Sequence, residues 1–353
     1  MLQPTVKKSL FDGAFIPAHP LALNEDRTLD ELSQRALTRY YIEAGVGGLA
    51  VGVHTTQFEI RNPQFNLYER VLTLAMEEMK RAHVGEDFIK IGGVCGPTEQ
   101  AVKEAQFLKD TGYNLALLSM GGLDYSEAQL LERTRVVAAV IPVVGFYLQT
   151  SVGGRKLSYE FWCELADIEN VYAIKVAPFN RYQTFDVVRA VCQSSRNEEI
   201  AIYTGNDDNI VADLLSTYKV RVGDKTVHKQ IIGGLLGHWS VWVKTAVAYF
   251  EDIKRVRNGR LIPTELLTRG LEITDANAAF FDPQHDFKGS IAGINEVLAR
   301  QGLLQGNWCL MDHEKLSPNQ AEEITRVYES YPHLHDDVFV AANLGKWKSG
   351  DQL

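Results

Sequence analysis

The sequence predicts a parallel (β/α)8 barrel, a TIM barrel, followed by a C-terminal helical extension. Short apolar runs alternate eight times with amphipathic stretches over residues 13–236 of the 353-residue chain. An open doubly wound sheet usually carries a G-x-G-x-x-G loop after its first strand, and no such loop follows the first run here. After the eighth run the pattern becomes helical.

The elements follow in a regular order. The first strand, residues 13–17, leads to a helix over 28–43, with Thr28 as its N-cap and Gly45 at its end. The later strands are expected at 48–54, 88–95, 114–120, 143–148, 171–178, 199–204 and 230–236. The helices between them are expected at 67–82, 98–110, 126–139, 158–167 and 185–192, with one more beginning at residue 210.

This order divides the chain into three parts. Residues 1–12 are expected to be an N-terminal tail, 13–245 the barrel, and 246–353 a C-terminal helical region. Helices are predicted at 239–258, 263–279, 289–301 and 318–330, and a loose tail at 347–353.

The composition excludes several classes of protein. A net charge of −9 disfavours nucleic acid and anionic membranes as partners. No uncharged apolar run is long enough to span a membrane, and the N-terminus lacks the apolar core of a signal peptide. The four cysteines are far apart in sequence, which favours reduced thiols and a cytoplasmic location.

The sixth strand contains an unusual lysine. Lys175 stands in the β-branched run Val171–Pro178, where its ammonium loses hydration if it is buried. A desolvated lysine has a lowered pKa, as an amine nucleophile needs near neutral pH. The alternative is a lysine at the strand end that extends its amine to solvent.

Catalytic groups of such barrels lie at the C-terminal ends of the strands. The polar residues at these ends are His54, Thr55, Thr56, Tyr147, Lys175, Thr204, Asn206, Asp207, Asp208, His238 and Ser240. A lysine with a phenol and hydroxyls nearby suits imine chemistry, because the amine attacks a carbonyl while the phenol moves protons. The nine histidines show neither H-x-H nor H-E-x-x-H spacing, so no metal site is expected.

Several of these segments together resemble the dihydrodipicolinate synthase / N-acetylneuraminate lyase family of pyruvate-dependent class I aldolases. The segment Asn170–Lys175 resembles the strand that carries the family's Schiff-base lysine. The pair Phe146-Tyr147 resembles its tyrosine site, and Tyr147 stands 28 positions before Lys175, as in the family. The resemblance implies that Lys175 forms the imine and that Tyr147 relays protons.

Three more segments extend the resemblance to substrate binding. Thr55 and Thr56 match the family's pair of hydroxyl residues that hold the pyruvate carboxylate, and His54 occupies the preceding glycine position. Gly205 and Asp207 lie in a segment that resembles S-G-D-D after strand seven. Ser240 lies in one that resembles G-x-x-G-x-I-S-V after strand eight. His54 could instead be bonded to a backbone carbonyl, and Asp207 could belong to a solvated loop.

The chain departs from the synthase where that enzyme recognises its second substrate. After strand four the synthase carries a tyrosine that it supplies to the site of a neighbouring subunit. This chain has Gly121 and Gly122 there, and Tyr125 is out of register with that tyrosine. Arg155 comes three residues after the position of the arginine that binds the second carboxylate. Whether Tyr125 or Arg155 replaces these groups stays open.

The sequence therefore predicts a Schiff-base-forming lyase that acts on a 2-oxo acid, such as pyruvate or a 2-oxo-3-deoxy sugar acid. No cofactor is expected, because the covalent imine on Lys175 is the electron sink. The alternatives are a sugar-acid dehydratase that uses the same imine, a catalytically silent barrel that binds a 2-oxo acid, and a metal-dependent barrel lyase. A homo-oligomer of unknown order is also expected.

Overall fold

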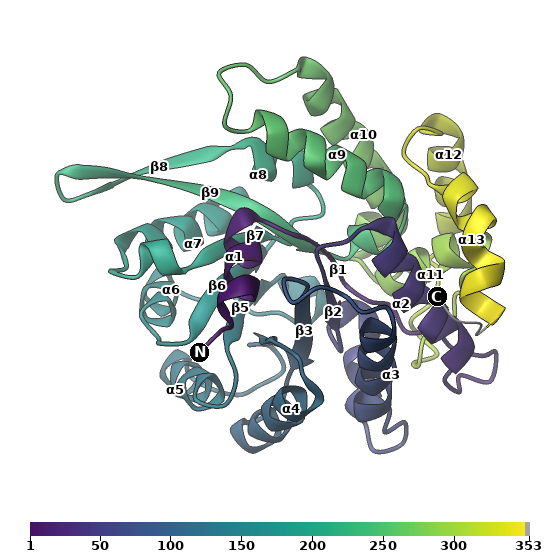
Figure 1. Ribbon diagram of the computed structural model, residues 1–353, viewed down its shortest axis with the longest axis horizontal. Helices are drawn as coiled ribbons and strands as arrows, with labels where there is room; N and C mark the ends of the chain where they lie inside the picture. Colours follow the sequence, from purple (N-terminus) through teal and green to yellow (C-terminus); the bar gives the residue numbers. More distant parts are fainter. Residues whose placement is uncertain (350–353) are drawn as a thin grey trace.

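Eight parallel strands form the barrel in the computed structural model, which describes residues 1–349 (Figure 1). The strands are β1 (Phe15–Pro17), β2 (Gly48–Val51), β3 (Ile89–Val94), β4 (Leu115–Leu118), β5 (Val143–Leu148), β6 (Val171–Ala177), β7 (Ala201–Thr204) and β9 (Lys225–Leu236). Their order is β1-β9-β7-β6-β5-β4-β3-β2, and a parallel bridge between Ala18 and Ala50 closes the circle. The (β/α)8 barrel predicted from the sequence is confirmed.

Eight helices surround the strands, one after each. They are α2 (Glu31–Ala44), α3 (Tyr68–Arg81), α4 (Thr98–Thr111), α5 (Glu127–Ala138), α6 (Tyr159–Ala166), α7 (Arg181–Gln193), α8 (Ile210–Leu215) and α9 (Val243–Val256). Helix α2 ends at Gly45 as predicted, because that glycine adopts a left-handed φ of 96°. Its N-cap is Asp30 rather than Thr28, since the Asp30 carboxylate accepts the Ser33 backbone N–H at 3.0 Å.

The N-terminal segment expected as a tail contains a helix, α1 (Pro4–Asp12). Its apolar side chains Val6 and Leu10, and Leu2 just before the helix, are buried in the same cluster as the inward-facing strand residues. The Tyr203 hydroxyl, from inside the barrel, donates a hydrogen bond to the Leu10 carbonyl at 2.8 Å. Helix α1 therefore closes the N-terminal end of the barrel.

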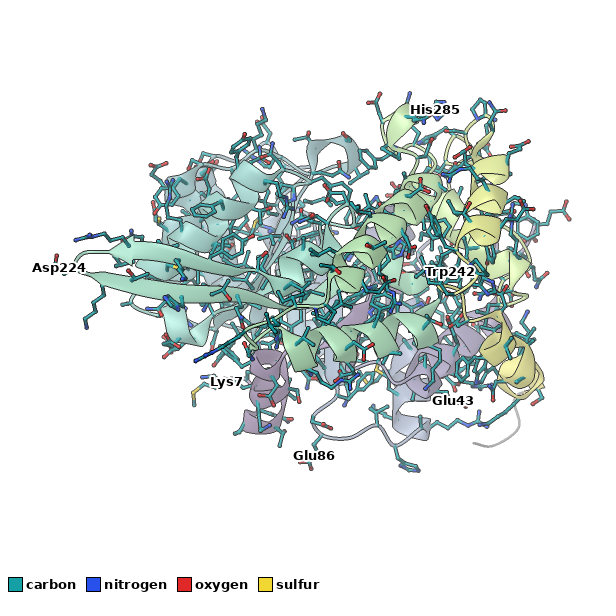
Figure 2. The ribbon with its side chains drawn as sticks, turned by 90° about the horizontal axis from the view of Figure 1, so that it is seen from above. Lys7, Glu43, Glu86, Asp224, Trp242 and His285 are labelled. Atoms are coloured by element: carbon teal, nitrogen blue, oxygen red, sulfur yellow. The ribbon has the colours of Figure 1, made fainter. Side chains whose placement is uncertain are left out.

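A hairpin arm, which the sequence analysis did not predict, precedes the last barrel strand. Strand β8 (Thr217–Val222) pairs antiparallel with the first half of β9 around the two-residue turn Gly223-Asp224. The arm extends beyond the barrel, with Asp224 at its far end (Figure 2). Only residues 231–236 of β9 pair with the other barrel strands.

Four helices follow the barrel: α10 (Thr264–Phe281), α11 (Ser290–Arg300), α12 (Gln320–Ser330) and α13 (Asp337–Ser349). The predicted boundary at residue 246 falls inside α9, the eighth barrel helix. Helix α13 packs on α2, where the buried Arg39 pairs with Glu78 and donates to the Trp347 carbonyl at 2.6 Å. Trp347 is fully buried and does not belong to a loose tail, while residues 350–353 lie outside the described part.

Candidate active site

Strand alternation turns Lys175 toward the barrel axis. Ala173 and Ala177 lie in the inward-facing cluster, whereas Ile174 and Val176 pack outward against the helices. Lys175 shares this inward face and is only 6% exposed, so its amine does not reach bulk solvent. Gly205 on the neighbouring strand end provides the space, because a Cβ there would lie 2.4 Å from the Lys175 Cε.

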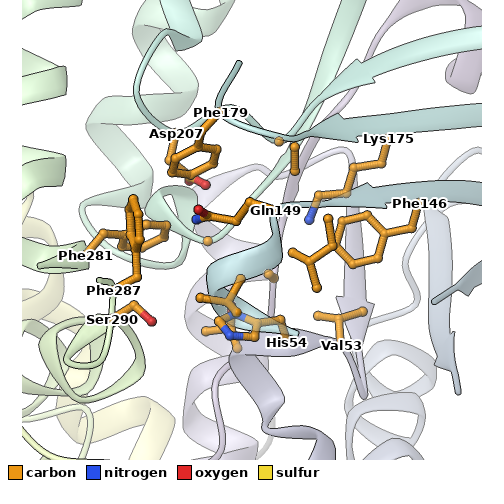
Figure 3. Close-up of a pocket in the computed structure, with 17 residues that line it drawn as sticks. Val53, His54, Phe146, Gln149, Lys175, Phe179, Asp207, Phe281, Phe287 and Ser290 are labelled. Carbon is orange, nitrogen blue, oxygen red and sulfur yellow. The ribbon is translucent and has the colours of Figure 1, made fainter. Parts of the chain in front are cut away.

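A cavity opens beside this lysine at the C-terminal end of the barrel (Figure 3). Its walls come from strand ends and from the C-terminal region. The lining residues are Ala18, Val53, His54, Thr55, Phe146, Leu148, Gln149, Val152, Lys175, Ala177, Phe179, Gly205, Asp207, Gly237, Phe281, Phe287 and Ser290. The structure thus brings Lys175, Thr55, His54, Gly205 and Asp207 together, as the sequence predicted.

The surroundings of Lys175 favour a neutral amine. Burial lowers the pKa of Lys175 from 10.5 to about 8, although the charge of Asp207 acts in the opposite direction. The Nζ atom lies 4.4 Å from the centre of the Phe146 ring, which supplies no proton acceptor of its own. About a tenth of the lysine is therefore a free amine at pH 7, far more than for a lysine with the usual pKa of 10.5.

Asp207 is the acidic residue of the cavity. Burial raises the pKa of its carboxyl group from 3.8 to about 7, while a hydrogen bond from the His238 backbone N–H, at 2.7 Å, opposes that rise. The pKa values of Asp207 and Lys175 are therefore about one pH unit apart. Because the two groups titrate as a coupled pair and burial favours the neutral form of each, a proton can move between Lys175 and Asp207 near neutral pH.

The two threonines of the predicted carboxylate site have different surroundings. The Thr55 side chain lines the cavity. The Thr56 hydroxyl instead accepts the backbone N–H groups of Gly52 and Val53 and donates to the His19 carbonyl at 2.6 Å. Because these three bonds use the Thr56 hydroxyl fully, the prediction that it binds substrate does not fit the structure.

His54 and Ser240 differ in their position relative to the cavity. His54 lines the cavity, and burial together with the nearby Lys175 lowers its pKa to about 4, so its imidazole is neutral at pH 7. Ser240 lies outside the cavity, where its hydroxyl donates to the Ala18 carbonyl. Ser240 therefore fixes the junction of the first and last strands, and the substrate-binding role predicted for it does not fit.

Tyr147 points away from the cavity, contrary to the sequence-based prediction. Residues alternate along β5, and Phe146 faces inward while Tyr147 packs outward against Trp162 of α6 at 4.8 Å between ring centres. In the strand register Phe146, not Tyr147, is opposite Lys175. The phenol that was expected to relay protons is thus separated from the lysine by the barrel wall.

Neither Tyr125 nor Arg155 lines the cavity. The Arg155 guanidinium donates to the Tyr125 carbonyl at 2.8 Å and to the Leu123 carbonyl at 3.4 Å. These bonds hold the segment after β4. The two side chains therefore take no part in lining the cavity.

His238 and Asp208 also lie outside the cavity. The His238 ring stacks on Phe280 with 5.5 Å between centres, and its Nδ1 lies 3.3 Å from the Asn277 amide nitrogen. His238 contributes to the site only through its backbone N–H, which holds Asp207.

The sequence analysis missed most of the cavity's apolar wall. Phe281 ends α10, Phe287 and Ser290 precede or begin α11, and Phe179 follows β6. The helical pattern of the C-terminal region predicted its helices but carried no signal that their connections cover the barrel mouth. Phe146 was quoted in the tyrosine motif, and period-two alternation was the signal that could have placed it inside.

Membrane-spanning helices and metal-binding groups are two further features that bear on function. Within residues 1–349, no helix has the length and apolar character needed to cross a membrane. In the same part of the chain, no three His, Cys, Asp or Glu side chains are grouped so that they could hold a metal ion.

The chain matches the model of the Dihydrodipicolinate synthetase family over residues 13–223. No curated protein sequence matches the chain significantly.

Solved structures share the fold at low sequence identity. N-acetylneuraminate lyase from Fusobacterium nucleatum, complexed with pyruvate, superposes with a TM-score of 0.71 and 19% identity, covering 92% of this chain and 99% of that one. Dihydrodipicolinate synthase from Oceanobacillus iheyensis gives 0.70 and 15%, covering 93% and 99%. An enzyme named CdNal from Clostridium difficile, in complex with mannosamine, gives 0.68 and 18%, covering 90% and 99%.

Proposed function

Since the chain belongs to the dihydrodipicolinate synthetase family, we propose that it is a class I aldolase-type lyase that forms an imine between Lys175 and a 2-oxo acid. The observation that carries the proposal is the buried lysine at the barrel mouth, whose pKa burial lowers to about 8. A neutral amine that faces a cavity is what attack on a ketone requires.

The imine supplies the electron sink of the reaction. The Lys175 amine adds to the keto carbon, and the carbinolamine loses water to give a protonated imine. When the bond between C3 and C4 breaks, its electron pair moves into the imine to form an enamine. Thr55, which lines the cavity, would hold the substrate carboxylate with its hydroxyl. This scheme needs neither a metal ion nor an organic cofactor.

Asp207 would move the protons in place of Tyr147. The carboxylate accepts the proton of the C4 hydroxyl as the aldehyde leaves, and the resulting acid returns that proton to C3 of the enamine. Its raised pKa suits both steps, because the group can hold or release a proton near pH 7. His54, Gly205 and Gln149 complete the walls around the reacting atoms.

Reductive trapping tests the imine. The protein is incubated with pyruvate and borohydride, and its mass is measured before and after peptide mapping. We expect one adduct on Lys175 and none in the Lys175→Ala variant. Lys229→Ala is the matched control, because burial also lowers the pKa of Lys229 but this residue lies on the hairpin arm. If no 2-oxo acid gives an adduct, the proposal is wrong.

Product analysis separates cleavage from the alternatives. Release of an aldehyde identifies the lyase, whereas a product that has lost only water identifies a dehydratase with the same imine. A protein that traps pyruvate but converts no 2-oxo acid is a binding barrel. The homo-oligomer and the cytoplasmic location stay predictions, which light scattering and cell fractionation can test.

A further inference from the structure

The wall of the cavity opposite the lysine is aromatic. Phe281 and Phe287 come from the C-terminal region and face Lys175 and Phe146 across the cavity (Figure 3). Phe179 completes this wall, and its ring meets the Phe287 ring edge to face, 5.5 Å apart at 80°. Edge-to-face and offset contacts of this kind also suit a third, substrate ring.

Backbone geometry holds the two paired rings firmly. Phe179 and Phe287 have φ angles of 50° and 64°, a left-handed conformation that is costly for a bulky side chain. The Asn206 side chain accepts the Phe179 N–H at 3.0 Å, and the Asp282 carbonyl accepts the Phe287 N–H at 3.0 Å. These bonds hold the backbone that carries both rings in the conformation that places them at the cavity.

The charges of the cavity argue against a strongly polar aldehyde half of the substrate. Among its described lining residues, Lys175 is the only Lys or Arg, and this amine is used by the imine. His54 is neutral at pH 7, because burial lowers its pKa to about 4. A phosphate or second carboxylate on the aldehyde would find no further cation among these lining residues, since Lys288 and His313 line only the adjoining pocket. A polyhydroxylated chain would lose water against phenylalanine rings.

From this arrangement we infer that the aldehyde half of the substrate is an aromatic ring. This inference rests on the proposed function and names its substrate class. The reaction is cleavage of a 4-aryl-4-hydroxy-2-oxobutanoate. The C3–C4 bond breaks, the C4 hydroxyl proton moves to Asp207, and the C4 carbon leaves as an aryl aldehyde. The enamine takes a proton at C3, and water then releases pyruvate from Lys175. No oxidant or reductant is consumed.

Paired substrates test the inference. Pyruvate release is measured from 4-hydroxy-2-oxo-4-phenylbutanoate and from a 2-oxo-3-deoxy sugar acid, with borohydride trapping of pyruvate run in parallel. We expect kcat/KM for the phenyl substrate to exceed that for the sugar acid about tenfold or more. The Phe281→Ala and Phe287→Leu variants should lose about tenfold more of their kcat/KM on the phenyl substrate than on the sugar acid.

The control is Phe185→Ala, since Phe185 is a partly exposed ring on α7 that packs on Tyr218 outside the cavity. Its kinetics should match those of the wild type, and thermal unfolding checks that every variant is folded. Equal or better cleavage of the sugar acid, with pyruvate still trapped, would overturn the aromatic inference and leave the lyase intact. Failure to trap pyruvate would instead refute the proposed function.

Discussion

The titration of Lys175 makes a quantitative prediction about imine formation. A lysine with a pKa of about 8 in place of 10.5 carries roughly 300 times more free amine at pH 7. The rate of imine formation with pyruvate should therefore rise with pH and reach half of its plateau near pH 8. In Asp207→Asn the midpoint should move to lower pH, because the charge that raises the pKa of Lys175 is gone.

The assay is reductive trapping with cyanoborohydride over a pH series, with the adduct on Lys175 quantified by mass spectrometry. Lys219 is exposed on the hairpin arm, and the small amount of adduct that forms there serves as the internal reference for reaction outside the cavity. A midpoint near 10 in the wild type would show that the amine is solvated and would refute the reasoning. A midpoint that rises in Asp207→Asn would refute the role assigned to that carboxylate.

Four further changes have defined outcomes. Tyr147→Phe should leave pyruvate trapping and turnover within about twofold of the wild type, because its phenol lies outside the barrel; a loss of 100-fold or more would restore the tyrosine relay. Gly205→Ala should abolish trapping while circular dichroism stays native, because the added Cβ occupies the space of the lysine chain. Thr55→Val should raise the pyruvate concentration for half-maximal trapping about tenfold, through loss of a hydrogen bond to a charged carboxylate. Lys175→Met should raise the free energy of unfolding at pH 7 by about 3 kcal/mol, since a buried ammonium is removed. Between pH 8 and 10.5 the lysine keeps its proton only in the unfolded state, so the wild type should become more stable as the pH rises and the difference from Lys175→Met should disappear. Denaturation at several pH values in that range measures this change.

The barrel and its lysine were predictable because both follow from patterns along the chain. Strand β6 is a short buried run in the sequence, and period-two alternation decides that Lys175 shares a face with Ala173 and Ala177. The order of strands also follows from the repeated pattern. The lysine's inward position could therefore be anticipated without knowledge of its neighbours.

The error at Tyr147 has a physical cause that spacing alone could not reveal. The pairing of β5 with β6 shifts by one residue between Val143 and Val144, and both Tyr172 and Ala173 face the barrel interior. This irregularity pairs Lys175 with Phe146, 29 positions before it, and turns the residue at 28 positions outward. A one-residue shift changes the face of every later side chain.

Long-range packing limits prediction elsewhere. Phe281 and Phe287 reach the cavity only because α10 and α11 fold back over the strand ends, and nothing local in the sequence indicates that approach. The hairpin arm had a local signal, the turn Gly223-Asp224 between two alternating runs, which was not used. Helix α1 was missed because Leu2, Val6 and Leu10 are buried only by contact with the barrel interior, which the local sequence does not indicate.

The docking of α13 on α2 has a consequence for biosynthesis. The chain emerges from the ribosome N-terminus first, so all eight strands and the lysine exist before residues 281–290 are made. The hydrogen bond from Arg39 to the Trp347 carbonyl can form only after Trp347 has been made. A chain interrupted in translation would thus display a reactive amine without the wall that encloses it. Synthesis of residues 281–290 is therefore the step that encloses Lys175.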